Sequence, residues 1–509
     1  MSLRNPPRSR SSPLLLASCF TLALAAPLLG QSGGQSSDLA ADSEHAREFL
    51  ASGQPGKAIP IYQQLVKAVP DNPGLMTNLG IAEEMAGRDR DAIEEFNAVL
   101  KMDPDYLNAR LFLGLAQLDA GKPQEAVGQL QKVIDRQPGN ELARWKLGEA
   151  YLTAGNNERA AEEYRDLCNS DPRNPKGWYG LGHSYLALSL ATVGKLRRLA
   201  PDSGYTLALA AEADSRQRQY SAAVQFYRQA MQKLPSLPGL HAAVAEVYRA
   251  AGHPEWAAAE ETREHLMAPP CNTQPLACDF EEARYDQLLS AASQHPAPES
   301  YYWETKTYDH LAIAAFDHLR ELPPGIEFYE LMAETDLAQG EFLQCVKDWQ
   351  EALKLRPNDP KIEKSLAIAY RQAGDQENAK EVLEGLVKSR PENSEAQYLL
   401  GDTLLSLHQP AQAIPILEKS LRLDPGLLLA EISLAQAYLE ARQPKEAIPH
   451  FRAALSLDRN GALYYDLARA YQQAGQTDLA QKMIERARAI RLAQEEAKSL
   501  PHQLEPPPP

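Results

Sequence analysis

The chain has 509 residues, a formal net charge of −16 and a pI near 5.3. This acidic balance argues against binding to nucleic acids or to anionic membrane surfaces, because both carry negative charge themselves. The length alone would suggest about three globular domains, but the spacing of residues along the chain favours a different organisation.

Residues 1–30 are expected to be an export signal peptide. Arg4, Arg8 and Arg10 precede a mostly apolar run over residues 14–29. A basic start followed by an apolar stretch is the order found in signal peptides. We therefore exclude this segment from the fold and expect the protein to leave the cytoplasm.

The export signal leaves more than one mature form open. Ala23-Leu24-Ala25 offers a cleavage site, which would release a periplasmic or secreted protein. Residues 16–19 also resemble a lipobox, so an alternative is an outer-membrane lipoprotein anchored through Cys19. An uncleaved anchor is a third form, although the apolar run is too short and interrupted to be a good membrane span. Membrane contact is expected only through such an N-terminal anchor.

After the signal, the sequence repeats with a period close to 34 residues. The prolines of this series are Pro70, Pro104, Pro138, Pro172, Pro201, Pro235, Pro269, Pro357, Pro391 and Pro425. An alanine series shares the phase: Ala58, Ala92, Ala126, Ala160, Ala223, Ala257, Ala379, Ala413 and Ala447, with Ala480 one residue early. A fixed period of this length indicates an array of small structural units that are stable only when stacked.

The segment 101–138 shows what one unit contains. Apolar residues recur at helical spacing over 111–118 and again over 126–134, and Gly121-Lys122-Pro123 separates the two runs. This pattern predicts helix, tight turn, helix, tight turn. Proline lacks an N–H group and disfavours helix at the residue before it, so Pro138 should end the second helix.

Two further sets of residues recur in phase with the units. Capping pairs restart the next helix: Asn72-Pro73, Asn174-Pro175 and Asp359-Pro360. Small residues of the first helices are expected to meet the recurrent alanines where two helices approach closely: Gly80, Gly114, Gly148, Ala245, Ala367, Gly401 and Ala435.

The segment Trp178-Tyr179-Gly180-Leu181-Gly182-His183-Ser184-Tyr185 carries Trp, Leu-Gly and Tyr at the offsets of the tetratricopeptide signature. With the proline and alanine series, the chain resembles the tetratricopeptide repeat family over roughly residues 37–493. The resemblance implies an all-α, right-handed solenoid of helix-turn-helix repeats, with about 13–14 units. An exported bacterial member of the family is expected.

Two repeats are five residues shorter than the others. One runs from Pro172 to Pro201, a spacing of 29, and a matching one ends at Pro324. Both lack the glycine-alanine turn between their helices. One interpretation is a lengthened or kinked helix that the solenoid absorbs, and the other is a bend in the superhelix.

A larger break falls at residues 270–296, which read as an irregular Cys/Pro segment with an apolar stretch too short for a full unit. We therefore expect an N-terminal array over 31–269 and a C-terminal array over 297–493. The Pro-rich tail over 494–509 is expected to be disordered.

Cysteine usage is consistent with export. Cys271 and Cys278 are expected to form a disulfide, because exported proteins mature in an oxidising compartment. The alternative, a metal pair, lacks two further ligands at suitable spacing. Cys168 and Cys345 fall at helix positions that favour small apolar residues, so both are expected to be buried free thiols.

The sequence contains no motif that would support catalysis. HExxH, GxSxG, GxxxxGK[ST] and CxxC are absent. Asp309-His310 and Asp317-His318 form the densest histidine cluster, but no third ligand is placed for a metal. We expect no catalytic residues, no cofactor, no metal site and no enzyme activity.

The resemblance implies that the first helix of each repeat lines a concave groove that binds protein or peptide segments. The phase of the repeats assigns these residues to the groove: Trp145, Lys176, Tyr179, His183, Tyr302, Lys306, Lys361, Lys364, Arg371, Tyr398, Tyr465 and Arg469. Aromatic residues beside charges suit a binding surface, although an ordinary mixed helix face is the alternative.

Three functions remain open from the sequence. The first is a non-catalytic, exported scaffold that binds a protein or peptide partner in the groove. The second is a lipid-anchored envelope assembly factor, and the third is an accessory subunit of a glycan- or peptide-modifying enzyme. The identity of the partner does not follow from the fold.

Overall fold

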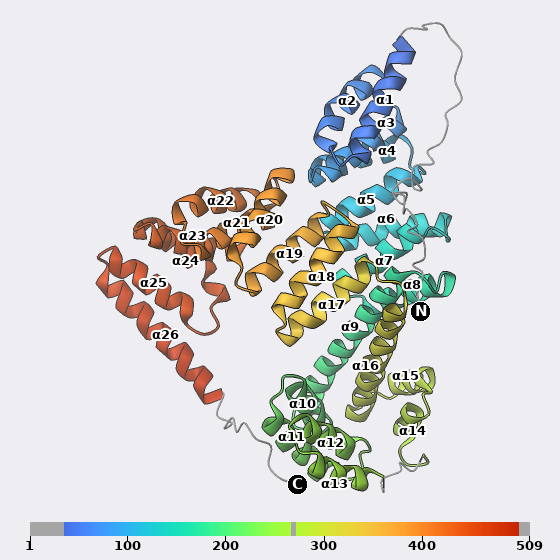
Figure 1. Ribbon diagram of the computed structural model, residues 1–509, viewed down its shortest axis with the longest axis vertical. Helices are drawn as coiled ribbons and strands as arrows, with labels where there is room; N and C mark the ends of the chain where they lie inside the picture. The colour runs from blue at the N-terminus through green and yellow to red at the C-terminus, as the bar shows by residue number, and fades with distance from the viewer. Residues whose placement is uncertain (1–34, 266–270, 498–509) are drawn as a thin grey trace, which may run out of the picture. The chain divides into compact units, whose positions relative to one another are not determined.

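The computed structural model describes residues 35–265 and 271–497. Over these residues the chain forms 26 α-helices and one short 3₁₀ helix, without any strand (Figure 1). The prediction of an all-α, helix-turn-helix repeat fold is confirmed. Within the same residues, no helix is both long and apolar enough to cross a bilayer. The predicted signal peptide and Cys19 lie outside the described residues.

The described residues divide into two compact units, one that ends at residue 121 and one that begins at residue 122. The first contains the pairs α1/α2 and α3/α4, followed by α5. Its helices are α1 (Gln35–Ala51), α2 (Pro55–Ala68), α3 (Pro73–Met85), α4 (Asp89–Met102) and α5 (Leu107–Asp119). Tyr62 and Phe96 are the largest fully buried side chains of its core.

The second compact unit contains the remaining helices. The first of these are α6 (Pro123–Arg136), α7 (Glu141–Thr153), α8 (Asn157–Ser170), α9 (Pro175–Leu199), α10 (Gly204–Arg216), α11 (Tyr220–Lys233), α12 (Leu240–Ala250) and α13 (Pro254–Glu264). Next come α14 (Pro275–Glu281), α15 (Tyr285–Gln294), α16 (Pro298–Glu321), α17 (Ile326–Gln339), α18 (Phe342–Leu355), α19 (Pro360–Gln372) and α20 (Gln376–Ser389). The last are α21 (Ser394–Ser406), α22 (Pro410–Leu423), α23 (Leu428–Glu440), α24 (Pro444–Ala454), η1 (Leu455–Leu457), α25 (Ala462–Gln473) and α26 (Thr477–Ala497).

Helix boundaries follow the predicted capping residues. The side chains of Asn72, Asn174 and Asp359 accept hydrogen bonds from backbone N–H groups of the first helical turn, at 3.1, 3.1 and 2.9 Å. These bonds satisfy donors that a helix start leaves without partners. At the other end, α4 and α6 stop two residues before Pro104 and Pro138.

The turn between the two helices of a repeat needs a residue in the left-handed backbone region. Gly87, Gly155 and Gly374 adopt φ angles of 75°, 77° and 79° there, which glycine does at little cost. Neither α9 nor α16 contains a residue with positive φ, so each helix runs on without a turn, for 25 and 24 residues respectively. The lengthened-helix interpretation of the two short repeats therefore describes both.

Close packing within a repeat depends on the predicted small residues. The recurrent alanines are all buried, with between 0% and 6% of their surface exposed. The glycines of the first helices contact a large side chain one turn beyond the alanine, rather than the alanine itself. A methyl group at Gly80 would lie 2.6 Å from Phe96, and one at Gly148 would lie 2.8 Å from Tyr164. Glycine is required there because no space remains for Cβ.

The two long helices pack along each other (Figure 1). Residues 175–188 of α9 lie against the second half of α16: Gly182 contacts the Phe316 ring, and the Trp178 and His318 rings stack with centroids 4.5 Å apart. Residues 189–199 of α9 lie against the first half of α16, where Ser189 donates a 2.6 Å hydrogen bond to Asp309. Each long helix therefore supplies half of two composite repeats.

The composite repeats belong to two separate hydrophobic cores. The first half of α9 and the second half of α16 share a core with α8 and α17, which continues the array from α7/α8 to α17/α18. The opposite halves share a core with α10–α15, which contains Leu196, Tyr302 and Trp303. We call this second group, residues 189–309, the side lobe.

The segment 270–296 contains two short helices, α14 and α15, of 7 and 10 residues. This agrees with the expectation that its apolar stretch is too short for a full repeat. Cys271 and Cys278 are joined in a disulfide, with a Cα–Cα distance of 5.3 Å. At the C-terminus, α26 continues to Ala497, so the start of the predicted tail is helical, and residues 498–509 lie outside the described part of the chain.

Candidate functional site on the first helices

The predicted groove corresponds to a surface of the second compact unit that is formed by the first helices of its main array. These are α7, α9, α17, α19, α21, α23 and α25, and we call this surface the first-helix face. Because a helix turns every 3.6 residues, residues spaced three and four apart project from the same side of each helix. The side chains on this face interact from one first helix to the next.

An aromatic and a basic residue meet between α7 and α9. The Lys176 ammonium lies 3.7 Å from the centre of the Trp145 ring, and Lys146 lies 4.1 Å from the same centre. Such a contact places positive charge against the electron-rich face of the indole. The first-helix face therefore already holds one lysine ammonium of α9 by a cation–π contact.

Tyr179 and His183 of α9 both bind Glu334 of α17. The Tyr179 hydroxyl donates to Glu334 Oε1 at 2.7 Å, and His183 Nε2 lies 3.1 Å from Oε2. Burial alone would raise the pKa of Glu334, but the His183 contact and the tyrosine hydrogen bond outweigh it and hold this pKa below its usual value. Burial and then the Glu334 and Glu330 charges raise the pKa of Tyr179, so its phenol stays protonated as a donor.

Two more carboxylates lie on the same face of α17. Glu327 and Glu330 precede Glu334 by seven and four residues, a spacing that puts all three on one stripe. Burial, followed by the charges of Glu327 and Glu334, raises the pKa of Glu330 to about 8. Glu330 is therefore largely protonated at neutral pH, because an unpaired carboxylate is costly away from water.

The next first helices are connected by ion pairs. Lys364 of α19 lies 2.8 Å from Glu395 of α21. Arg371 of α19 pairs with Asp402 of α21, and Ser433 of α23 donates a 2.6 Å hydrogen bond to the same carboxylate. Basic residues of α19 thus pair with acidic residues of α21 that lie 31 residues further along the chain, one helical turn short of the repeat period.

One ion pair spans helices that are not neighbours in the array. Lys361 of α19 reaches Glu149 of α7, with an N–O distance of 3.3 Å, and Lys146 lies 2.7 Å from the same carboxylate. Burial would raise the pKa of Glu149, but the two ammonium groups lower it overall. This contact brings α7 and α19 together across the part of the face that α9 and α17 form.

Two predicted groove residues do not belong to this face. Tyr302 is only 3% exposed and lies in the side-lobe core, and Lys306 pairs with Glu212 of α10 at 2.7 Å. Both assignments were wrong, because they treated the first half of α16 as a first helix of the main array. That half instead packs on α9 and the lobe helices.

The other predicted residues are placed on first helices of the main array. Tyr398 and Tyr465 are half-buried on α21 and α25, and Arg469 is exposed and pairs with Asp466 of its own helix at 3.2 Å. Four acidic residues of this face were not predicted: Glu334, Glu395 and Asp402, which pair with predicted residues, and Glu330. Their signal was the same repeat phase, which the abundance of acidic residues concealed.

The residues considered for metal binding have other contacts in the structure. Asp309 accepts a hydrogen bond from Ser189, and His318 stacks on Trp178. Cys271, Cys278 and Glu282 have ligand atoms within 4.8 Å of one another, but the two sulfurs are joined in the disulfide. Cys168 and Cys345 are buried free thiols, as predicted.

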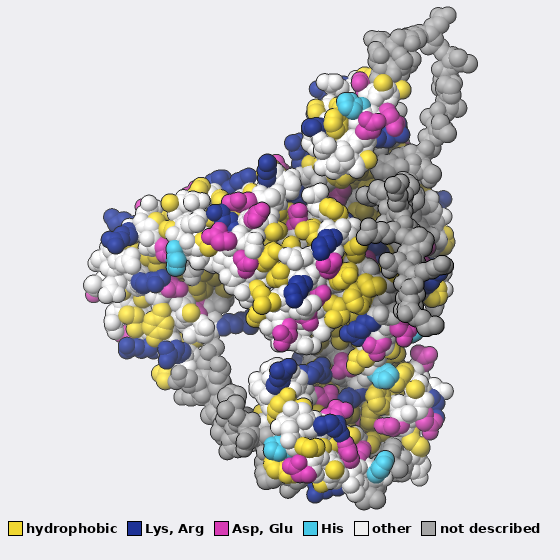
Figure 2. Space-filling view, viewed as in Figure 1, with side chains coloured by type: hydrophobic (Ala, Val, Ile, Leu, Met, Phe, Trp, Pro, Cys, Tyr) yellow, Lys and Arg dark blue, Asp and Glu magenta, His cyan; other side chains and the backbone are white. Residues whose placement is uncertain are grey.

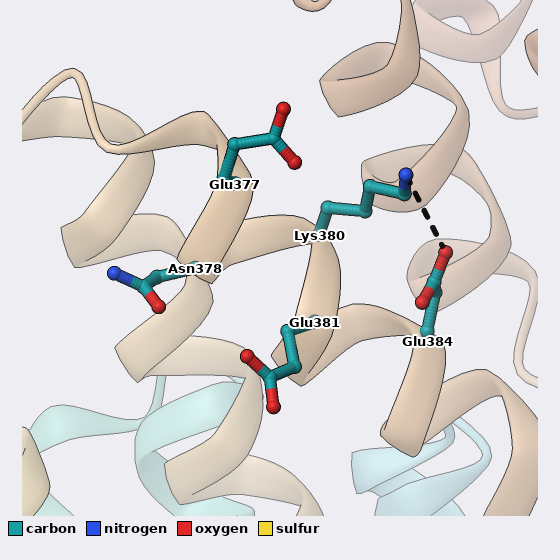
Figure 3. A pocket seen from close by; sticks show the side chains of 5 residues that line it. All are labelled: Glu377, Asn378, Lys380, Glu381 and Glu384. Carbon is teal, nitrogen blue, oxygen red and sulfur yellow. Dashed lines mark ion pairs between the residues drawn. The ribbon is translucent and has the colours of Figure 1, made fainter.

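Acidic and basic side chains are interspersed on the visible face over α17–α22 (Figure 2). A shallow depression on α20 is lined by Glu377, Asn378, Lys380, Glu381 and Glu384. These side chains come from one helix and spread to both sides of it, with Lys380 and Glu384 4.0 Å apart (Figure 3).

Stacked helix pairs with a row of interacting side chains on their first helices define an α-helical repeat scaffold of the kind used for protein–protein interaction. Models of the tetratricopeptide repeat match residues 43–107, 111–177, 146–193, 364–427 and 439–501. These matches cover more than half of the chain, which therefore belongs to the tetratricopeptide repeat family. The stretch between residues 193 and 364 contains nearly all of the side lobe and the whole of α16, whereas most of α9 lies within a matched range.

Solved structures of similar fold include two tetratricopeptide proteins of bacteria. MamA from Desulfovibrio magneticus RS-1 is 22% identical over 34% of this chain and 97% of its own, with a TM-score of 0.31. The protein TTC0263 of Thermus thermophilus is 20% identical over 35% of this chain and 100% of its own, with a TM-score of 0.29. No curated protein is significantly similar to this chain.

Proposed function

We propose that this chain is a non-catalytic scaffold that binds a protein or peptide partner on the first-helix face. The observation that carries the proposal is the row of aromatic and charged side chains at equivalent positions of successive first helices. Trp145 and Tyr179 are 34 residues apart on α7 and α9, and Glu330, Lys364 and Tyr398 follow one another at the same spacing on α17, α19 and α21. A row that continues over several repeats suits an extended partner better than a small molecule enclosed in one cavity.

The composition of this row favours contact with a protein. Tyrosine, tryptophan and arginine contribute disproportionately to the free energy of protein interfaces, and Trp145, Tyr179, Tyr398 and Arg371 are half-buried on this face. Their exposed parts remain available to a ligand. Their buried parts hold them in place, which lowers the entropy lost on binding.

We further propose that the protein acts outside the cytoplasm, either as a soluble mature chain or anchored through Cys19. The basic and apolar order of residues 1–30 supports export, and the disulfide between Cys271 and Cys278 suits an oxidising compartment. Mass spectrometry of the mature N-terminus separates the two forms. A start at Ala26 or Gln31 indicates signal cleavage, whereas a lipid on Cys19 indicates an anchor.

Crosslinked affinity capture from the cell envelope tests the binding function. Wild-type protein, Tyr179→Ala and Glu381→Ala would be captured in parallel, because Glu381 is exposed on α20, a second helix away from the proposed face. The proposal predicts one dominant partner that is lost with Tyr179→Ala and retained with Glu381→Ala. Equal recovery with both variants would contradict binding at the first-helix face.

A further inference from the structure

Glu327, Glu330 and Glu334 form an acidic row on α17, which we call the α17 stripe. Within the described part of the chain, two of these carboxylates have no ion-pair partner. Glu330 is half-buried, and Glu327 is only 9% exposed. Among the residues that the structure describes, neither makes a hydrogen bond or an ion pair, whereas Glu334 binds Tyr179 and His183. Buried carboxylates are normally paired, because removing a charge from water without compensation is expensive.

The nearby cations of α19 are directed to other helices. Lys361 binds Glu149 of α7, Lys364 binds Glu395 and Arg371 binds Asp402. Arg356, which precedes α19, pairs with Asp359 at 3.1 Å, and its charge lowers the pKa of Glu330 by less than burial and the neighbouring carboxylates raise it. The basic residues beside α17 therefore stabilise contacts elsewhere on the face, and the α17 stripe keeps excess negative charge.

We infer that the partner inserts a lysine or arginine side chain against Glu330, between α9 and α17 of the first-helix face. Charge complementarity selects a basic segment over an acidic one. Tyr179 adds aromatic surface close by, because its hydroxyl binds Glu334, one helical turn from Glu330. This inference rests on the proposed function and adds to it the charge of the ligand.

The protonation state of Glu330 in the free protein is consistent with its binding a cation from the partner. Without a cation the carboxyl stays largely protonated, since burial and the neighbouring Glu327 and Glu334 raise its pKa to about 8. A docked ammonium or guanidinium would allow it to ionise and would form a charge-assisted hydrogen bond with it. The net charge of −16 also favours approach of a basic segment, with an ionic-strength dependence that can be measured.

Fluorescence anisotropy with two probe peptides tests the inference. One is a short, fluorescein-labelled peptide of lysine, alanine and glycine, and the other carries glutamate in place of each lysine. Full-length protein is compared with Glu330→Gln and with Glu381→Gln, the same change at an exposed residue of α20 (Figure 3). We expect the basic peptide to bind at low salt, Glu330→Gln to weaken it about tenfold, and Glu381→Gln to leave it unchanged.

Three results would overturn the inference: no binding of the basic peptide at millimolar concentration, equal binding by both variants, or tighter binding of the acidic peptide. The natural partner separates this failure from that of the proposed function. A captured partner that is lost with Tyr179→Ala but retained with Glu330→Gln would support the binding face and refute its preference for a basic segment.

Discussion

Gly182 on α9 lies directly against the ring of Phe316 on α16, where a side chain at Gly182 would overlap the ring. In an ordinary repeat of this chain the same contact joins a helix to the next helix along the sequence, as Gly148 does with Tyr164. The contact between α9 and α16 instead joins two helices that the side lobe separates in the sequence, and together they form one repeat. The main array therefore continues through a contact between residues far apart in the sequence.

Replacing Gly182 with alanine is expected to destabilise the protein by about 1–3 kcal/mol, because its Cβ would overpack against Phe316. The matched control is Gly194→Ala on the same helix, where Cβ would meet only the Arg198 side chain at 3.6 Å. Alanine there should stabilise the helix by about 0.5–1 kcal/mol. Urea unfolding of both variants measures the difference, and similar effects at the two positions would contradict the packing described.

Tyr302→Ala is expected to cost about 3–5 kcal/mol of stability, because the ring is buried in the side-lobe core. Tyr179→Ala should cost less, since Tyr179 is half-buried on the first-helix face, and should weaken partner capture instead. Thermal melting followed by circular dichroism, combined with capture, distinguishes the two roles. A Tyr302→Ala protein that is stable but fails to bind would place Tyr302 in the binding surface after all.

Glu330→Gln is expected to stabilise the free protein at alkaline pH. Folding raises the pKa of Glu330 from 4.5 to about 8. The contribution of this carboxyl to the stability of the folded protein is therefore fully present below pH 4.5 and is lost as the pH rises through 8. Glutamine cannot ionise, so the variant should gain about 1–2 kcal/mol over wild type near pH 9, allowing for solvent screening. Denaturant midpoints at pH 4.5 and pH 9 test this, and a constant difference across the range would contradict it.

Binding of the basic probe peptide should depend on pH through the same group. If only ionised Glu330 binds the cation, affinity should rise about tenfold per pH unit below its pKa of about 8 and level off above it. The groups that face it are Glu327, Glu334, Asp359 and Arg356. Anisotropy titrations with wild type and Glu330→Gln separate its contribution, and an identical pH profile for the two proteins would argue against it.

Loss of the Cys271–Cys278 disulfide should loosen the side lobe. Cys271 is exposed, so Cys271→Ser removes the crosslink with little change in packing. A short closed loop of this kind contributes about 2–3 kcal/mol. Hydrogen exchange should become faster in α14 and α15, while α21–α24 remain unchanged. Uniform protection across the chain would show that the crosslink contributes nothing measurable.

Much of the fold could be predicted from the sequence because repeats impose local rules. The positions of Ala92, Pro138 and Asn174 each follow from one requirement: close helix approach, a helix end and a helix start. Each requirement involves residues that are only a few helical turns apart in the sequence. They recur with a fixed period, so the array and its helix pairs could be recognised without the structure.

The pairing of α9 with α16 could not be predicted in the same way. The sequence showed that the turn was missing in both repeats, but a helix without its turn can pair with any partner of suitable phase. The choice depends on contacts such as Gly182 with Phe316, which are distant in sequence. Tyr302 was assigned to the wrong surface for this reason, and Glu330 was missed because acidic residues are abundant throughout the chain.

The most direct test of binding at the first-helix face is site-specific photocrosslinking in living cells. A photoreactive phenylalanine derivative would replace Lys364 on α19 in one variant and Glu381 on α20 in another. If the partner binds this face, one defined crosslinked partner is expected from position 364 and none from position 381. Crosslinking from position 381 alone, or equally from both positions, would contradict binding at the first-helix face.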